Sequence, residues 1–268
     1  MYRDKPLIKE YGKGSPRVVV VGSLHGDEPV GARIIKAIEK HPLYKGTLIT
    51  IVGNPVALQK GVRYIAQDLN RCFPGKKTGS HEEKLAHQIE KIIRHADYCI
   101  DIHSTSTNTR RAAIIKKKNV FVKKLLSLCV PEHIVIMPKG VGDGSLINFC
   151  KAGVSLEYGK HQSRQTYTES LRDTLLVLEN LGMIQKTRLT KKPWKISKYY
   201  SVYGTEPKPE SFIMRKSILN FELIKKGDVL GKVSEKEIFA KESFYPVLFG
   251  GRSYKEIMGF KAKRLESL

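Results

Sequence analysis

Short apolar runs rich in β-branched residues alternate with segments of helical periodicity up to about residue 185. Such a run predicts a buried strand, and apolar residues three and four apart predict one face of a helix. Strands that alternate with helices indicate a mixed, mostly parallel sheet covered on both faces, the α/β class. The expected strands cover residues 18–21, 48–52, 98–103, 112–115, 133–137 and 154–156, and the expected helices cover 30–38, 80–96 and 169–181.

The composition changes near residue 189. Lys191, Lys192 and Pro193 are typical of a linker, and short β-rich pieces separated by glycine and proline follow them. We therefore expect an α/β domain over residues 1–190 and a small all-β domain over residues 191–268. The 268 residues, 41% of them hydrophobic, are enough to bury the core of a large domain and a small one.

The chain shows no sign of a membrane segment. No run approaches the roughly 18 apolar residues of a membrane-spanning helix, and residues 1–5 contain no apolar signal-peptide core. We expect a cytoplasmic protein without a membrane partner. Its four cysteines form no C-x-x-C pair, which excludes a zinc ribbon or a thioredoxin-like motif.

The net charge of +22 raises the question of nucleic-acid binding. Residues 191–268 carry 17 Lys and Arg and 9 Asp and Glu, which is close to a proportional share, so the charge is not held in a tail. The densest cluster, at Lys116–Lys118 and Lys123–Lys124, lacks the interleaved aromatic residues that stack on bases. A solvated basic surface, or one that steers anionic substrates, is therefore favoured over a nucleic-acid partner.

Metal-binding side chains follow two of the expected strands. The strand at residues 18–21 leads to His25 and Glu28, and the strand at residues 98–103 ends at His103. Ligand sites of open α/β sheets lie at the carboxyl ends of the strands, so these side chains can meet at one edge. Two His and one Glu, with a fourth position for water, make a standard catalytic zinc set. Asp101, two residues before His103, is a candidate supporting carboxylate.

Two further groups of residues could act on a substrate beside such a metal. Arg63, Asp68, Asn70 and Arg71 lie in a loop-like segment, and arginine makes bidentate contacts with carboxylates. Glu157 ends the strand at residues 154–156, where a buried carboxylate needs a partner or a task. Beside zinc, Glu157 would be the general base that takes a proton from water and returns it to the leaving amine.

Together these residues resemble the succinylglutamate desuccinylase/aspartoacylase family, relatives of the zinc carboxypeptidases. The resemblance runs from about residue 15 to 185 and returns near the C-terminus, between Tyr245 and Tyr254. It rests on four ordered motifs: His25-Gly26-Asp27-Glu28, Asn54-Pro55 with Arg63 and Asp68-Leu69-Asn70-Arg71, Asp101-Ile102-His103-Ser104-Thr105, and Leu156-Glu157-Tyr158-Gly159.

The resemblance implies a zinc-carboxypeptidase-like fold and a role for each motif. One zinc ion would be held by His25, Glu28 and His103. Arg63 would polarise the scissile carbonyl, Asn70 and Arg71 would hold the α-carboxylate of a small anionic N-acyl amino acid, and Asp68 would belong to the same substrate-binding segment. Glu157 would act as base and then acid. Tyr254 would reach the site from the C-terminal domain, which would cap it.

The chain also departs from the family pattern. Aspartoacylase has an Arg and a Tyr shortly before the catalytic Glu, whereas residues 145–151 contain no Arg. The substrate side chain is therefore left open, as is a homo-oligomeric state. Two alternatives to an N-acyl amino acid deacylase remain: a zinc carboxypeptidase-like peptidase, and a basic nucleic-acid-associated protein with a vestigial metal site.

Overall fold

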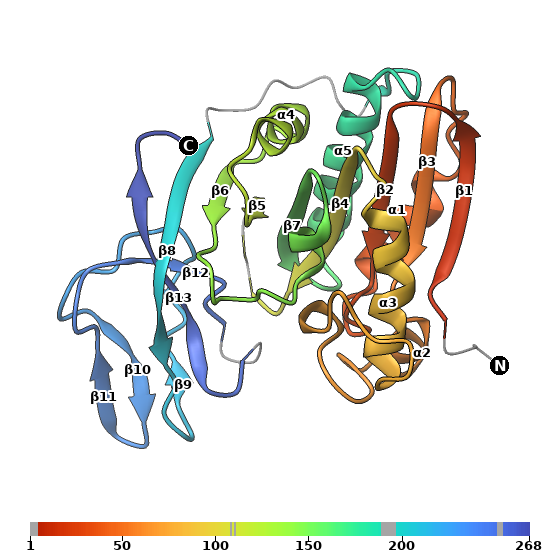
Figure 1. The fold of residues 1–268 in the computed structure, drawn as a ribbon. Coiled ribbons are helices and arrows are strands. Elements are labelled where there is room, and N and C mark those ends of the chain that lie inside the picture. Colours follow the sequence, from red (N-terminus) through yellow and green to blue (C-terminus); the bar gives the residue numbers. More distant parts are fainter. Residues whose placement is uncertain (1–4, 108, 110, 189–196, 251–253) are drawn as a thin grey trace.

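A computed structural model describes residues 5–107, 109, 111–188, 197–250 and 254–268. Its centre is a ten-stranded sheet of order β1-β3-β2-β4-β7-β5-β6-β8-β13-β12 (Figure 1). The strands are β1 (Leu7–Lys13), β2 (Arg17–Gly22), β3 (Gly46–Val52), β4 (Tyr98–Thr105), β5 (Ala112–Ile115), β6 (His133–Ile136), β7 (Gly153–Lys160), β8 (Lys198–Pro207), β12 (Tyr245–Val247) and β13 (Ile257–Leu265).

The middle of this sheet is parallel, as the alternation of strands and helices predicts. Strand β2 pairs in parallel with both β3 and β4, and β4 pairs in parallel with β7. Strand β5 runs antiparallel to β7, and β1 runs antiparallel to β3 at the edge, so the sheet is mixed. The carboxyl ends of β2, β4 and β7 therefore lie at one edge of the sheet.

Helices cover both faces of the parallel strands. Apolar residues of α1, α4 and α5 share one core with Val18, Val20 and Ile100 of the sheet. Apolar residues of α3 share a second core with Val19 and Val21, whose side chains point to the opposite face. The helices are α1 (Val30–Ile38), α2 (Pro55–Lys60), α3 (His81–Ile93), α4 (Val120–Cys129) and α5 (Arg164–Asn180), with short 3-10 helices at Leu69–Arg71 and Leu146–Phe149.

The C-terminal part joins the large sheet and adds a small one. Strand β8 pairs in parallel with β6, and β13 and β12 follow it antiparallel. A separate antiparallel sheet holds β9 (Ile213–Met214), β10 (Val229–Val233) and β11 (Lys236–Phe239), and it has a core of its own. The predicted fold class is thus confirmed, while the domain boundary at residue 190 and the linker at Lys191–Pro193 lie outside the described residues.

The structure also contains elements that periodicity alone did not indicate. Strand β1 is almost wholly exposed at the sheet edge, so it lacks an apolar run. Helix α4 carries Lys123 and Lys124 within its apolar pattern, and α5 begins at Arg164, five residues before the predicted start. None of the helices in the described ranges combines the length and apolar character needed to cross a membrane.

A buried ion pair joins the loop before β5 to helix α5. The Nε and Nη2 atoms of Arg111 donate to the carboxylate of Asp173 at 2.7 and 2.6 Å, and the hydroxyl of Tyr158 donates to it at 3.1 Å. Both charged side chains are only 4% exposed. Since Tyr158 follows Glu157 in β7, this network anchors the strand that carries the predicted base.

We expect Asp173→Ala to lower the free energy of unfolding by about 3–5 kcal/mol, because it removes the carboxylate that pairs with the buried Arg111 cation. Glu10→Ala is the matched control: it removes the half-exposed carboxylate paired with Arg17 at 3.2 Å, and such pairs contribute about 0–1 kcal/mol. Urea unfolding followed by circular dichroism measures both. Equal losses in the two variants would contradict the prediction.

Candidate active site

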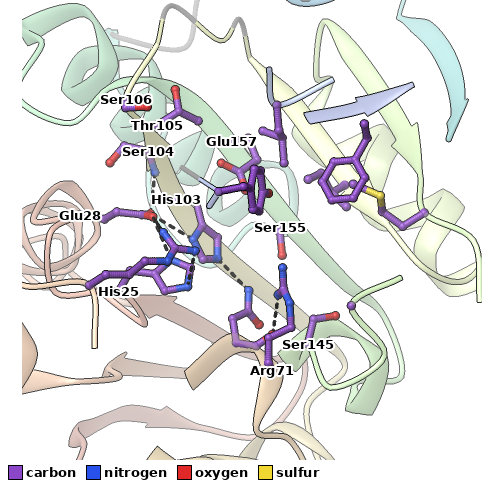
Figure 2. A pocket seen from close by; sticks show the side chains of 18 of the residues that line it. His25, Glu28, Arg71, His103, Ser104, Thr105, Ser106, Ser145, Ser155 and Glu157 are labelled. Atoms are coloured by element: carbon purple, nitrogen blue, oxygen red, sulfur yellow. Dashed lines mark hydrogen bonds and ion pairs between the residues drawn. The ribbon is translucent and has the colours of Figure 1, made fainter. Parts of the chain in front are cut away.

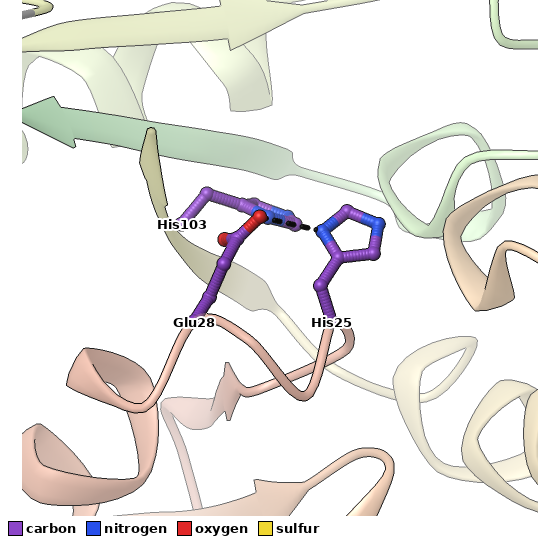
Figure 3. Close-up of side chains that lie close together, drawn as sticks. All are labelled: His25, Glu28 and His103. Atoms are coloured by element: carbon purple, nitrogen blue, oxygen red, sulfur yellow. Dashed lines mark hydrogen bonds and ion pairs between the residues drawn. The ribbon is translucent and has the colours of Figure 1, made fainter. Parts of the chain in front are cut away.

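The side chains of His25, Glu28 and His103 meet at the carboxyl edge of the sheet (Figure 3). The first two come from the loop between β2 and α1, and His103 comes from β4. All three are buried, and their candidate ligand atoms lie within 4.8 Å of one another. Nδ1 of His25 lies 2.8 Å from Oε1 of Glu28, and Nδ1 of His103 lies 3.1 Å from its Oε2. The structure thus brings the three predicted metal ligands together.

The outer nitrogen of each imidazole contacts a second carboxylate. Nε2 of His25 lies 2.9 Å from Asp68, and Nε2 of His103 lies 2.6 Å from Asp101. A carboxylate at Nε2 keeps the proton on that nitrogen and leaves Nδ1 free to bind a metal. Asp101 contacts the imidazole of His103, as predicted from its place two residues earlier in the chain. Asp68, which lies in the predicted substrate-binding segment, contacts His25 and Arg63.

Electrostatics bind this cluster tightly. Burial raises the pKa of Glu28, but the imidazoles of His25 and His103 outweigh it and hold the pKa well below its usual value. Burial lowers the pKa of His103, but Asp101 and Glu28 raise it well above its usual value. Two imidazoles and one carboxylate that converge in a buried pocket, each imidazole oriented by its own carboxylate, are a donor set that fits zinc.

The segment that carries Arg63 is held by a carboxylate on α3. Glu82 is completely buried and accepts the backbone N–H groups of residues 65–67 at 2.7–3.2 Å, as well as Nδ2 of Asn54 at 3.1 Å. The backbone carbonyl of Arg63 accepts the N–H of Gly26 at 3.1 Å. Gly26 itself must lack a side chain, because a Cβ there would lie 2.1 Å from the backbone of Ala57.

Arg63 and Asn70 lie directly beside the cluster. Nη2 of Arg63 lies 3.1 Å from both Asp68 and Nε2 of His25. Nδ2 of Asn70 lies 3.4 Å from Nε2 of His103, and its Oδ1 accepts the backbone N–H of Leu146 at 2.9 Å. This fixed amide orientation turns the NH2 group of Asn70 toward the site.

Glu157 lies opposite His103 across the β4–β7 ladder and lines the same pocket. Burial raises the pKa of the Glu157 carboxyl to about 7, although His103 lowers it; Glu28 raises it further. A carboxyl group with a pKa near neutrality can both accept and donate a proton at working pH.

These residues surround one cavity of about 320 Å³. Figure 2 shows Glu157, Arg71 and Ser145 around it together with the His25–Glu28–His103 cluster. Tyr254 lines it from the C-terminal part, and burial raises the pKa of this phenol to about 12. All of the residues predicted to bind metal or substrate, or to act as the base, line this cavity except Asp68.

Two serines have contacts in the site that the sequence analysis did not predict. Ser104 donates its backbone N–H to Glu28 at 2.9 Å, and its hydroxyl lies 2.9 Å from Nδ1 of His161. Ser155 donates to Asp101 at 3.2 Å. Ser104 follows His103 directly, and Ser155 lies two residues before Glu157. This proximity in the sequence was the available signal, but only the pairing of β4 with β7 shows that both serines lie at the site.

Comparison with known proteins agrees with this geometry. The sequence pattern of the succinylglutamate desuccinylase/aspartoacylase catalytic domain matches residues 14–182 of the chain. This segment holds the His25–Glu28–His103 cluster and Glu157, and it is more than half of the chain. The protein belongs to this family.

Individual relatives support the same assignment. A probable aspartoacylase from Nostoc is 36% identical over 41% of this chain and 42% of the relative. An N-acyl-aromatic-L-amino acid amidohydrolase (carboxylate-forming) from Xenopus tropicalis is 32% identical over 53% of this chain and 54% of the relative. The matched segments thus span about two fifths to a half of these relatives. The crystal structure of murine aminoacylase 3 shares the fold, with a TM-score of 0.78, 18% identity and coverage of 95% of this chain and 97% of that one.

We expect Glu82→Ala to free the segment around Arg63, because three backbone N–H groups and Asn54 lose their acceptor. The loss of buried hydrogen bonds lowers the free energy of unfolding by about 3 kcal/mol. Under native conditions trypsin then cleaves faster after Arg63 and Arg71, which mass spectrometry of the fragments detects. Lys84→Ala, at an exposed position of the same helix, should leave cleavage at both arginines unchanged. Unchanged cleavage in Glu82→Ala would show that the carboxylate does not hold this segment.

Proposed function

We infer that this protein is a zinc-dependent hydrolase that cleaves the amide bond of a small N-acyl amino acid. The products are a free amino acid and a carboxylic acid. The observation that carries this conclusion is the convergence of the His25–Glu28–His103 cluster, Glu157 and Arg63 on one cavity. The family membership supports it, and the two relatives named above are described as an aspartoacylase and an amidohydrolase.

His25, Glu28 and His103 would hold the zinc ion. When bound, zinc supplies Lewis acidity, which polarises a carbonyl and makes water a better nucleophile. The chain's own contribution is to orient the ligands. Asp68 and Asp101 accept the Nε2 protons, so that both Nδ1 atoms face Glu28.

Glu157 moves the proton. Its carboxylate takes a proton from the attacking water as the C–O bond forms at the carbonyl carbon, and returns it to the amide nitrogen as the C–N bond breaks. Burial suits it to this task, because it raises the pKa of the Glu157 carboxyl and so makes the carboxylate a stronger base than an exposed one.

The remaining polar residues bind the substrate. The guanidinium of Arg63 lies beside His25, where it can stabilise negative charge that develops on the carbonyl oxygen. Arg71 and the NH2 group of Asn70 are donors for the α-carboxylate. Tyr254 closes the cavity from the C-terminal part. Because Leu248, Tyr254 and Phe260 all line the cavity, a small acyl amino acid is favoured over the longer substrates of a carboxypeptidase-like enzyme.

The metal assignment predicts the effect of Asp101→Asn. Loss of the carboxylate at Nε2 of His103 should weaken zinc binding about 10–100-fold, measured by competition with a chromogenic chelator. His103→Ala should retain no stoichiometric zinc. Glu237→Gln, an exposed change on β11, serves as the control. If Asp101→Asn and Glu237→Gln bind zinc equally well, Asp101 does not support the metal site.

The proton-transfer role predicts the effect of Glu157→Gln. This variant keeps the shape of the side chain but cannot accept a proton, so kcat should fall about 10²–10⁴-fold. Zinc content and KM should stay within a few-fold, because Glu157 is not a proposed ligand. Release of amine from an N-acetyl amino acid, with metal content measured in the same sample, tests both. Full activity in Glu157→Gln with zinc bound would remove this residue from the mechanism.

A further inference from the structure

One wall of the cavity is apolar and rigid. It is formed by Ile114, Met137, Val141, Ile147, Leu248 and Phe260. All six pack into the same hydrophobic core, on the face of the sheet that α3 covers. Four of them are at most 8% exposed, so the wall cannot rearrange without disturbing that core.

A lysine lies at this wall, but its ammonium group is fully hydrogen-bonded within the protein. The side chain of Lys116 is 5% exposed. Its ammonium donates to the carbonyl oxygens of Pro138 and Val141, both at 2.7 Å, and to Asp143 at 2.8 Å. An ammonium has three N–H donors, so Lys116 has none left for a ligand.

The other cations that line the described cavity have their own partners or tasks. Arg63 is paired with Asp68 and Glu28, and Arg71 is the proposed anchor of the α-carboxylate. A carboxylate placed against the apolar wall would therefore be buried without a counter-ion from the described residues, which is strongly unfavourable. An apolar group placed there gains from leaving water.

The position of the wall identifies the part of the substrate that meets it. Arg71 lies beside the turn that follows Val141: a Cβ added at Gly142 would lie 3.8 Å from Cζ of its guanidinium, and one added at Gly144 would lie 2.1 Å from its backbone oxygen. An amino acid carries its carboxylate and its side chain on the same carbon, so a carboxylate at Arg71 places the side chain next to this wall. At the other end of the cavity, Thr105 and Ser106 lie far from Arg71 and Ser145 (Figure 2). There the cavity adjoins a second, more open hollow, which is also lined by Lys160 and Arg215, and this leaves that end for the acyl group.

We propose that this wall is the side-chain subsite and that the protein selects N-acyl derivatives of neutral apolar amino acids over those of aspartate and glutamate. The proposal rests on the proposed function, because it uses Arg71 as the carboxylate anchor. The sequence left the preferred substrate side chain open, because residues 145–151 contain no arginine, and the proposed subsite assigns this preference.

The test compares kcat/KM of the zinc-loaded full chain for N-acetyl-L-phenylalanine, N-acetyl-L-leucine and N-acetyl-L-aspartate, which share one acyl group. The apolar substrates should be favoured at least about 100-fold, since both the gain from burial and the penalty for an unpaired carboxylate contribute. Ile147→Arg should reduce this ratio at least tenfold by providing a counter-ion. Val120→Arg adds the same charge at an exposed position and should leave the ratio unchanged.

Binding of free amino acids provides a readout that needs neither a variant nor turnover. L-phenylalanine should raise the Tm of the unmodified protein at concentrations where L-aspartate does not. Equal or better hydrolysis of N-acetyl-L-aspartate would overturn the proposed specificity and leave the deacylase intact. Selective binding of L-phenylalanine without hydrolysis of any N-acetyl amino acid would support the subsite and contradict the proposed function. The absence of both hydrolysis and selective binding would overturn the proposed subsite and the proposed function.

Discussion

The carboxylate of Glu28 is the group on which the rest of the site depends. It lies within 3.1 Å of Nδ1 of both His25 and His103, and it also accepts the backbone N–H of Ser104 at 2.9 Å. The loop after β2 is thereby tied to the end of β4. In this structure the Glu28 carboxylate balances the charge of the two imidazoles. In the proposed function the same three side chains would hold zinc, so the ligands would need little rearrangement to bind it.

A second buried carboxylate, that of Glu82, holds the segment that carries Arg63. Residues 63–68 lie outside helices and strands, so their backbone N–H groups have no partners from regular structure. Glu82 accepts three of them from the N-terminal turn of α3, and the loop keeps Arg63 beside His25. The Arg111–Asp173 pair supports β7 and Glu157 in the same way. In each case a polar interaction outside the proposed chemistry fixes the position of a residue to which we assign a role in it.

Much of this arrangement follows from local sequence signals. Apolar runs that end in His25 and His103 predict strands with ligands at their carboxyl ends, and the Ser80 capping box predicts the start of α3, which the structure confirms. The contacts of Asp68, Glu82 and Lys116 could not be predicted. Asp68 lies between Arg63 and Arg71 in the sequence, and only the tertiary fold shows that it contacts His25. Glu82 and Lys116 are ordinary charged residues in the sequence, and their burial depends on segments far away in the chain.

The way in which the C-terminal strands join the sheet has a consequence for specificity. Because β8 pairs with β6, and β13 with β8, the sheet continues without interruption from the strands that carry His103 and Glu157 to the strand that carries Phe260. The apolar wall is therefore built from both parts of the chain and belongs to one hydrophobic core. A substitution that changes which side chains fit must also change the packing of that core, so specificity and stability are coupled. The proposed metal ligands lie at the ends of the parallel strands, where the Glu28 carboxylate holds them, and they can stay in place while the apolar wall varies.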